Sequence, residues 1–134
     1  MIKYKSGYKY QLVKEYYIKV EIFPDEDIRI KYITFYQGGY LRIKEGYCWD
    51  GPSGPTVDTK NFMRGSLVHD ALYQLMREGL IDQENRKQAD KELRRICLED
   101  GMSTIRAWWV YQALRKYADF AADPKNKKKI ITAP

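Results

Sequence analysis

The sequence contains few of the residues on which many catalytic and metal sites depend. Its 134 residues include one histidine and two cysteines. A single histidine excludes the HExxH motif and every zinc site with two histidine ligands. There is no GxSxG segment to present a nucleophilic serine on a strand–turn–helix elbow. Any chemistry of the histidine, His69, must therefore involve carboxylates or backbone groups.

The cysteines and the apolar residues exclude further classes of protein. Two cysteines, Cys48 and Cys97, are too few for a disulfide-rich secreted scaffold. We expect both to be reduced thiols; the alternative is one disulfide bridge between them. The first ten residues lack the apolar core typical of a signal peptide, and no apolar run reaches transmembrane length. We therefore expect a protein made and kept in the cytoplasm, which leaves only by lysis or within a particle.

The composition is that of a folded chain, with 44% hydrophobic and 31% charged residues, and its length predicts one domain over residues 1–134. Lys and Arg number 24 against 18 Asp and Glu, which gives a net charge of +6. This excess favours anionic partners, either nucleic acid or acidic lipid, without choosing between them. The alternative to an anionic partner is that these charges only form a solvated helix face, because acids and bases alternate between Glu84 and Arg95.

The pattern along the chain predicts an α+β fold, with an N-terminal antiparallel sheet or hairpins followed by three helices. Residues 1–47 are rich in Tyr, Ile and Val, and Gly38-Gly39 predicts a hairpin turn between 32–36 and 40–43. Residues 48–59, with two glycines and two prolines, predict a loop; residues 60–122 are helical in period; and 123–134 form a basic tail.

The helical part divides at recognisable start and stop signals. A first helix is expected over about 59–78, a second from an N-cap at Asp82 to Gly101, and a third from a cap at Ser103. The short connection at 79–82 predicts that the first two helices pack antiparallel. We expect Leu72, Leu93 and either Trp108 or Trp109 to share one core.

Four polar side chains stand out in this helical pair. At about 100° per residue, His69 and Tyr73 project on one side of the first helix, while Asp70 turns toward a neighbouring edge. Asp90 lies on the apolar side of the second helix, and a buried acid needs a partner. Antiparallel packing brings Asp90 near His69. The alternatives are a histidine used only in packing and an Asp90 paired with Arg86 or Arg94 at helical spacing.

These residues resemble the phospholipase A-two family, in which a calcium loop precedes a helix with His-Asp-x-x-Tyr and a second helix offers an Asp to the histidine. The matching segments lie within about residues 46–118; they are 49–53 (WDGPS), 69–73 (HDALY) and 85–90 (NRKQAD). The same stretch is similar to an uncharacterised family of tailed-phage and prophage proteins. That likeness implies a place in the host cytoplasm or the virion.

The phospholipase resemblance implies a role for each residue. His69 would be the general base that takes a proton from water, Asp90 would fix its tautomer, and Tyr73 would hydrogen-bond Asp90. Asp70 would bind calcium. The remaining ligands would be backbone carbonyls of the loop, with the Asp50 carboxylate, drawn from Trp49, Asp50, Gly51 and Ser53. The expected reaction is calcium-dependent hydrolysis of phospholipid esters, at a phospholipid or membrane surface.

The sequence also departs from that family. Pro52 and Pro55 stand where the calcium loop of the family uses glycines, the family's disulfides are missing, and the N-terminal strands are not part of it. The alternative function is therefore a non-enzymatic phage accessory or structural protein that binds a host or virion protein. Nucleic acid is the less favoured partner, because no known nucleic-acid motif is present. The oligomeric state is open.

Overall fold

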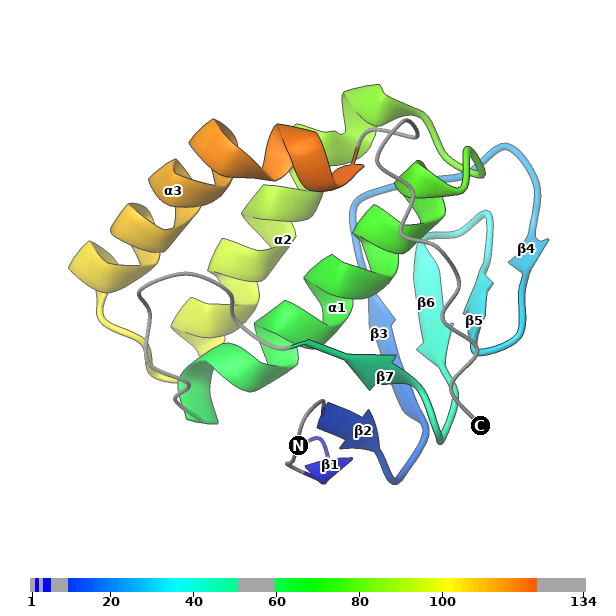
Figure 1. The fold of residues 1–134 in the computed structure, drawn as a ribbon, viewed down its shortest axis with the longest axis horizontal. Helices are drawn as coiled ribbons and strands as arrows, with labels where there is room; N and C mark the ends of the chain where they lie inside the picture. Colours follow the sequence, from blue (N-terminus) through cyan, green and yellow to red (C-terminus); the bar gives the residue numbers. More distant parts are fainter. Residues whose placement is uncertain (1, 3, 6–9, 51–59, 123–134) are drawn as a thin grey trace.

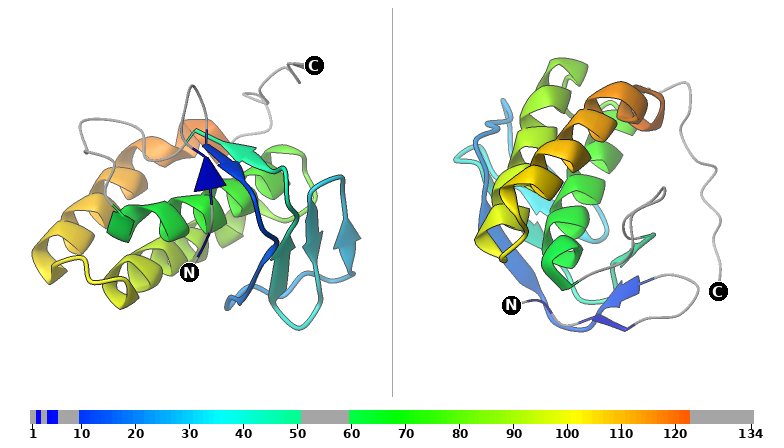
Figure 2. Two further views of the ribbon diagram at one scale, coloured as in Figure 1. Left: turned by 90° about the horizontal axis from the view of Figure 1, so that it is seen from below. Right: turned by 90° about the vertical axis from the view of Figure 1, so that its left-hand side faces the viewer.

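The computed structural model describes residues 2, 4–5, 10–50 and 60–122 (Figure 1). The predicted α+β fold is confirmed, since antiparallel strands precede three helices. The elements are β1 (Tyr4–Lys5), β2 (Tyr10–Leu12), β3 (Tyr16–Lys19), β4 (Ile28–Arg29), β5 (Ile33–Phe35), β6 (Tyr40–Ile43), β7 (Cys48–Trp49), α1 (Lys60–Arg77), the 3-10 turn η1 (Gln83–Asn85), α2 (Arg86–Glu99) and α3 (Thr104–Ala122). The helices and the strands lie on opposite sides of the molecule, with α1 nearest to the strands (Figures 1 and 2).

The strands form two small antiparallel sheets. One has the order β1-β2-β7 and the other β3-β6-β5-β4. One expectation about this region is wrong, since Cys48 and Trp49, placed by the sequence in the loop 48–59, pair with β2. The expected start of the strand before the Gly38-Gly39 turn is confirmed, because the amide of Lys44 donates to the carbonyl oxygen of Tyr32 at 2.8 Å. A turn at Ile30 separates this strand from β4, and β4 and β5 pair with each other.

The predicted hairpin joins β5 to β6, with Ile33 opposite Ile43 and Phe35 opposite Leu41. One position of its turn can be occupied only by glycine. Gly39 has φ +88°, and a Cβ there would lie 2.4 Å from the carbonyl oxygen of Val20. No residue with a side chain fits this site, because both the backbone conformation and the space exclude it.

Both long helices before α3 end at a glycine. Gly79 follows α1 with φ +73°, and Gly101 follows α2 with φ +95°. In each case the amide of the next residue returns to a carbonyl five positions earlier, from Leu80 to Leu75 and from Met102 to Cys97. This is the Schellman arrangement, which satisfies the last carbonyls of a helix and stops it. The helix ends expected near Gly79 and Gly101 are confirmed.

Helices α1 and α2 run antiparallel and in close contact (Figure 1). The two helices approach closely at Gly65, where a Cβ would lie 2.9 Å from Sγ of Cys97 and 3.2 Å from the carbonyl oxygen of Leu93. One helical turn farther along α1, the same approach brings His69 against Asp90. The glycine therefore sets the spacing at which the two polar side chains can meet.

The third helix packs differently from what the sequence suggested. Trp108 and Trp109 are 50% and 53% exposed, so the expectation that one of them joins the core is wrong. The residues of α3 that face inward are Ala107, Val110 and Tyr111. Two adjacent tryptophans lie about 100° apart on a helix, and the buried face of α3 is formed by Ala107, Val110 and Tyr111 rather than by the indoles.

The two cysteines are both free; Cys48 is exposed and Cys97 is buried, so the alternative of a bridge between them is excluded. Burial raises the pKa of the Cys97 thiol to about 12, which keeps it protonated and unreactive. Within the described parts of the chain, no helix combines the length and the apolar character needed to cross a membrane.

We predict that Gly65→Ala lowers the free energy of unfolding, although alanine is the better helix former by about 1 kcal/mol. The new methyl group would press on the Cys97 sulfur, and overpacking of this kind costs about 1–3 kcal/mol. In a Cys97→Ala background the sulfur is gone, so the same substitution should cost less. Chemical denaturation of the four proteins in this cycle measures the coupling; additive effects would show that the helices do not meet here.

Candidate active site

The site is built from one turn of α1 and the middle of α2. His69 and Tyr73 lie four residues apart on α1, with ring centroids 4.0 Å apart, and both reach the same oxygen of Asp90. His69 Nε2 lies 2.7 Å from Asp90 Oδ1, and the Tyr73 hydroxyl donates to that oxygen at 2.6 Å. The predicted contact between His69 and Asp90 is confirmed, and so is the bond from Tyr73.

Asp90 is a carboxylate with no solvent-exposed surface. Burial by itself would raise its pKa, but the hydrogen bonds from His69, Tyr73 and Arg115 and the charge of His69 hold that pKa below its ordinary value of 3.8. Asp90 is therefore ionised at neutral pH. Burial and the adjacent carboxylate in turn raise the pKa of Tyr73, so that its hydroxyl remains a donor.

The contact with Asp90 also fixes the tautomer of His69. An ionised carboxylate only accepts hydrogen bonds, so the proton of the neutral imidazole must lie on Nε2. The lone pair is then on Nδ1, the nitrogen that faces away from Asp90. A carboxylate that holds an imidazole in this way makes the other nitrogen available as a base and stabilises the cation formed when it takes a proton. His69 and Asp90 thus have the geometry of a general-base pair.

A fourth member of the cluster was not found from the sequence. Arg115, on α3, donates through Nη1 to Asp90 Oδ2 at 2.7 Å. The sequence offered Arg86 and Arg94 as partners, but Arg94 lies over the ring of Tyr111 instead. The sequence contained a signal for this contact, since Arg115 lies one helical turn after the buried Tyr111 and so continues the inward face of α3.

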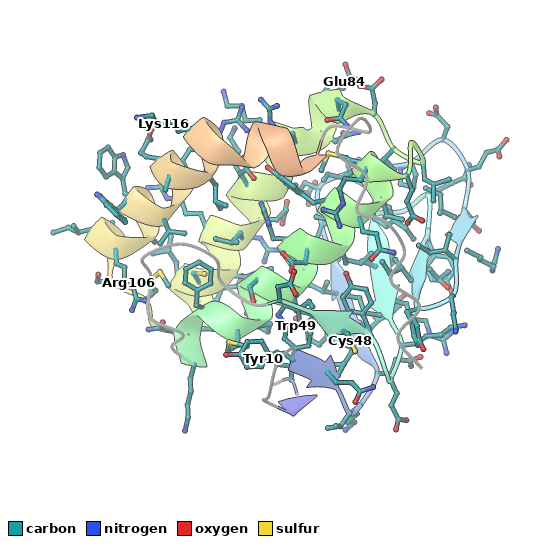
Figure 3. The ribbon with its side chains drawn as sticks, in the orientation of Figure 1. Tyr10, Cys48, Trp49, Glu84, Arg106 and Lys116 are labelled. Carbon is teal, nitrogen blue, oxygen red and sulfur yellow. The ribbon has the colours of Figure 1, made fainter. Side chains whose placement is uncertain are left out.

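Strand β7 is hydrogen-bonded to α1 close to this cluster. The indole of Trp49 is buried and donates from Nε1 to Oγ of Ser66 at 3.0 Å, and Ser66 donates to the carbonyl oxygen of Met63 at 2.8 Å. Figure 3 shows Trp49 where β7 crosses α1. Ser66 lies one turn before His69. The start of the segment that leads into α1 is thereby held in place beside the helix that carries the histidine.

The predicted metal ligands are described only in part. Gly51 and Ser53 fall outside the described residues. Burial raises the pKa of Tyr47, and the carboxylates of Asp70 and Asp50 raise it further, so both acids act on the same phenol. Both also take part in further polar or electrostatic interactions.

Among the described side chains, no group of three or more His, Cys, Asp or Glu could hold a metal. Asp70 and Asp50 supply two carboxylates, which is a donor set suited to a hard cation only if backbone carbonyls complete it. Among the described residues, these two carboxylates do not by themselves make up a calcium site.

We predict that Asp90→Asn destabilises the protein at neutral pH by about 3 kcal/mol, because removing one partner of a buried ion pair leaves the other uncompensated. The lowered pKa of Asp90 gives the sign of the pH dependence. Its contribution is present above pH 3.8 and is lost as the pH falls through the lower value of the folded protein. Denaturation at several pH values should show the variant and the parent protein converging in acid.

Glu99→Gln is the matched control for this comparison. The hydrogen bond from Arg64 lowers the pKa of Glu99 as well, but 47% of this side chain is exposed and its ion pairs lie on the surface. Exposed pairs contribute at most about 1 kcal/mol. An equal loss in both variants, or a penalty for Asp90→Asn that stays constant down to the lowest pH, would contradict an ionised and compensated Asp90.

The comparison with known proteins identifies a family but no function. No curated protein and no solved structure matches the chain significantly. Residues 29–114 match the family described as "Protein of unknown function (DUF1353)". The match begins at β4, includes His69, Tyr73 and Asp90, and ends one residue before Arg115. Because it covers more than half of the 134 residues, the chain belongs to the DUF1353 family.

Proposed function

We propose that the protein hydrolyses ester bonds of phospholipids, with His69 as the general base. The observation that carries this proposal is the hydrogen bond of 2.7 Å between His69 Nε2 and the ionised Asp90. It leaves Nδ1 as the basic nitrogen. In the proposed reaction Nδ1 accepts a proton from water as the water attacks the ester carbonyl, and the carboxylate stabilises the imidazolium that results.

The surroundings of the pair support a catalytic use of the histidine. Tyr73 and Arg115 occupy the other acceptor positions of Asp90, so the carboxylate cannot rotate away from the ring. The Tyr73 ring, tilted against the imidazole with centroids 4.0 Å apart, limits the movement of the imidazole. A base that is already oriented loses little entropy on reaching the transition state, which is what an active site requires of it.

Calcium is part of the proposal. Asp70, the residue after the base, and Asp50, the residue after β7, would bind the ion together with carbonyl oxygens of the segment 49–53. A bound calcium ion would polarise the ester carbonyl and stabilise the negative charge that develops on its oxygen. The phage setting, in the host cytoplasm or the virion, belongs to the proposal as well and is supported by the sequence resemblance alone.

One observation favours a second candidate function. Asp90 receives hydrogen bonds from both α1 and α3 while it is itself part of α2, so the cluster also joins three helices. A buried polar network can be retained because it specifies one packing arrangement. On this view the protein would be a non-enzymatic phage accessory or structural protein that binds a host or virion partner. The experiment that follows separates the two functions.

We predict calcium-dependent hydrolysis of a fluorogenic phospholipid, and its loss in His69→Ala. Asp70→Asn should weaken the calcium affinity, because this residue would contact the ion directly. Asp90→Asn should instead lower kcat, by about 100-fold, with calcium affinity largely kept, because Asp90 contacts only the base and second partners of this kind contribute about that much. Isothermal titration with calcium and assays at saturating calcium measure the two effects separately.

Glu99→Gln again provides the control, since it removes a carboxylate from α2 that contacts Arg64 and Arg95 but not His69. It should leave both calcium affinity and turnover unchanged. If the parent protein shows neither heat of binding nor hydrolysis at millimolar calcium, the enzymatic function is wrong and the packing function is the one supported. If Asp70→Asn and Asp90→Asn lower affinity and turnover alike, the division of roles between them is wrong.

A further inference from the structure

Helix α2 carries three cations in one line on its solvent side. Lys87 and Lys91 are exposed, and Arg94 is partly exposed. Spacings of four and three residues place the three side chains on one side of the helix. That side is opposite the one that buries Ala89 and Leu93. We call Lys87, Lys91 and Arg94 the basic row.

The acids of α2 do not neutralise the basic row, although acids and bases alternate in this part of the sequence. Asp90 and Glu92 are buried and have donors within the protein, and Glu99 forms two ion pairs on the surface. In the part of the chain that the structure describes, neither Lys87 nor Lys91 pairs with an acid. Like charges at this spacing destabilise a helix. The free protein therefore keeps a row of cations that an anionic partner would compensate.

The two ends of the basic row differ in their surroundings. Arg94 lies over the ring of Tyr111, with 5.7 Å between its guanidinium carbon and the ring centroid, so the contact holds the side chain without supplying a negative charge. At the other end, Glu84 lies in η1 three residues before Lys87, and Figure 3 shows it where α2 begins. Among the described residues no ion pair joins Glu84 to Lys87. Three cations and this one acid leave an excess of two positive charges.

We infer that the basic row binds the phosphate backbone of double-stranded DNA without reading its sequence. An isoelectric point above 9, together with Lys and Arg placed along one helix, is the electrostatic footprint of nucleic-acid binding. The isoelectric point of this chain is about 9.2. Phosphate contacts carry no sequence information, so a surface of this kind needs no recognition motif. This activity is separate from the proposed ester hydrolysis and does not depend on it.

The length of the basic row suits a linear polyanion. At 1.5 Å per residue, Lys87 and Arg94 lie about 10 Å apart along the helix. One strand of a duplex carries a phosphate every 3.4 Å of its axis, so about three phosphates fall within this length. Lysine and arginine both donate charge-assisted hydrogen bonds to phosphate oxygens. Each cation of the basic row can therefore contact one phosphate.

Two other occupants fit the basic row less well. A helix that lies on an anionic bilayer carries apolar residues on one side and cations on the other, and the apolar side enters the lipid. The basic row continues into a single apolar side chain, Leu98, which is 39% exposed and one turn after Arg94. A second copy related by a twofold axis would bring the same cations against one another, which opposes association.

The salt dependence of binding tests the inference with the full chain. The probe is a fluorescently labelled DNA duplex of arbitrary sequence, and binding is followed by anisotropy at salt concentrations from about 50 to 200 mM. A chelator is present, so that neither bound metal nor hydrolysis contributes to the signal. Three phosphate contacts predict a slope of about −2.7 for log K against log salt. Two duplexes of unrelated sequence should bind equally.

Substitutions of exposed residues test the basic row itself. Lys87→Gln and Lys91→Gln should each reduce the magnitude of the slope by about 0.9, and the double variant by about 1.8. Lys44→Gln is the matched control, because it removes the same charge from an exposed lysine after β6 and should leave the slope unchanged. Glu84→Gln should strengthen binding by about twofold at the same slope, since it removes a repulsive charge without adding a phosphate contact. Circular dichroism checks that each variant is folded.

Three results would overturn the inference. The first is a parent protein that does not bind the duplex at the lowest salt concentration. The second is an equal loss of slope in Lys44→Gln and Lys91→Gln, which would show that only the net charge of the chain matters. The third is binding of anionic vesicles or of an acidic peptide through Lys87 and Lys91 without binding of DNA, which would assign the basic row to that partner. Because no turnover is measured, none of these results depends on whether the protein hydrolyses esters.

Discussion

The helical half of the molecule is organised around one buried negative charge. An ionised carboxylate without solvent contact is costly unless several donors replace the water it has lost. Asp90 has three donors, and they come from the two helices on either side of its own. Each of the three helices must keep its place for the charge to remain compensated. The rotation of α3, which brings Arg115 inward and leaves Trp108 and Trp109 outside, meets this requirement.

A comparison within α2 shows that this arrangement goes beyond what a buried carboxylate needs. Glu92, two residues after Asp90, is also almost fully buried. Its donors include Gln88 and Arg95, one turn away on the same helix, and the amide of Glu21, which lies between β3 and β4. Local arginine and amide groups are therefore enough to hold an acid inside this fold. Asp90 also has an arginine donor, Arg115, but its other oxygen contacts Tyr73 and the single imidazole of the chain, in the orientation that leaves the second ring nitrogen basic.

The sequence predicted those parts of the fold and the site that depend on periodicity. Helical spacing placed His69 and Tyr73 on one side of α1, glycines marked the helix ends, and a carboxylate on an apolar face implied a buried partner. It did not predict β7, because a strand of two residues has no period and the pairing partner lies in β2, far along the chain. The position of Arg115 depends on the rotation of α3, which adjacent tryptophans on the same helix obscured.

Helix α3 contributes to the cluster around Asp90 and also to the surface of the protein. Its inner face supplies Arg115 to the carboxylate that contacts His69, and its outer face carries the exposed indoles. The two sets of residues lie on different sides of one helix, so a substitution at an exposed indole removes no donor of Asp90.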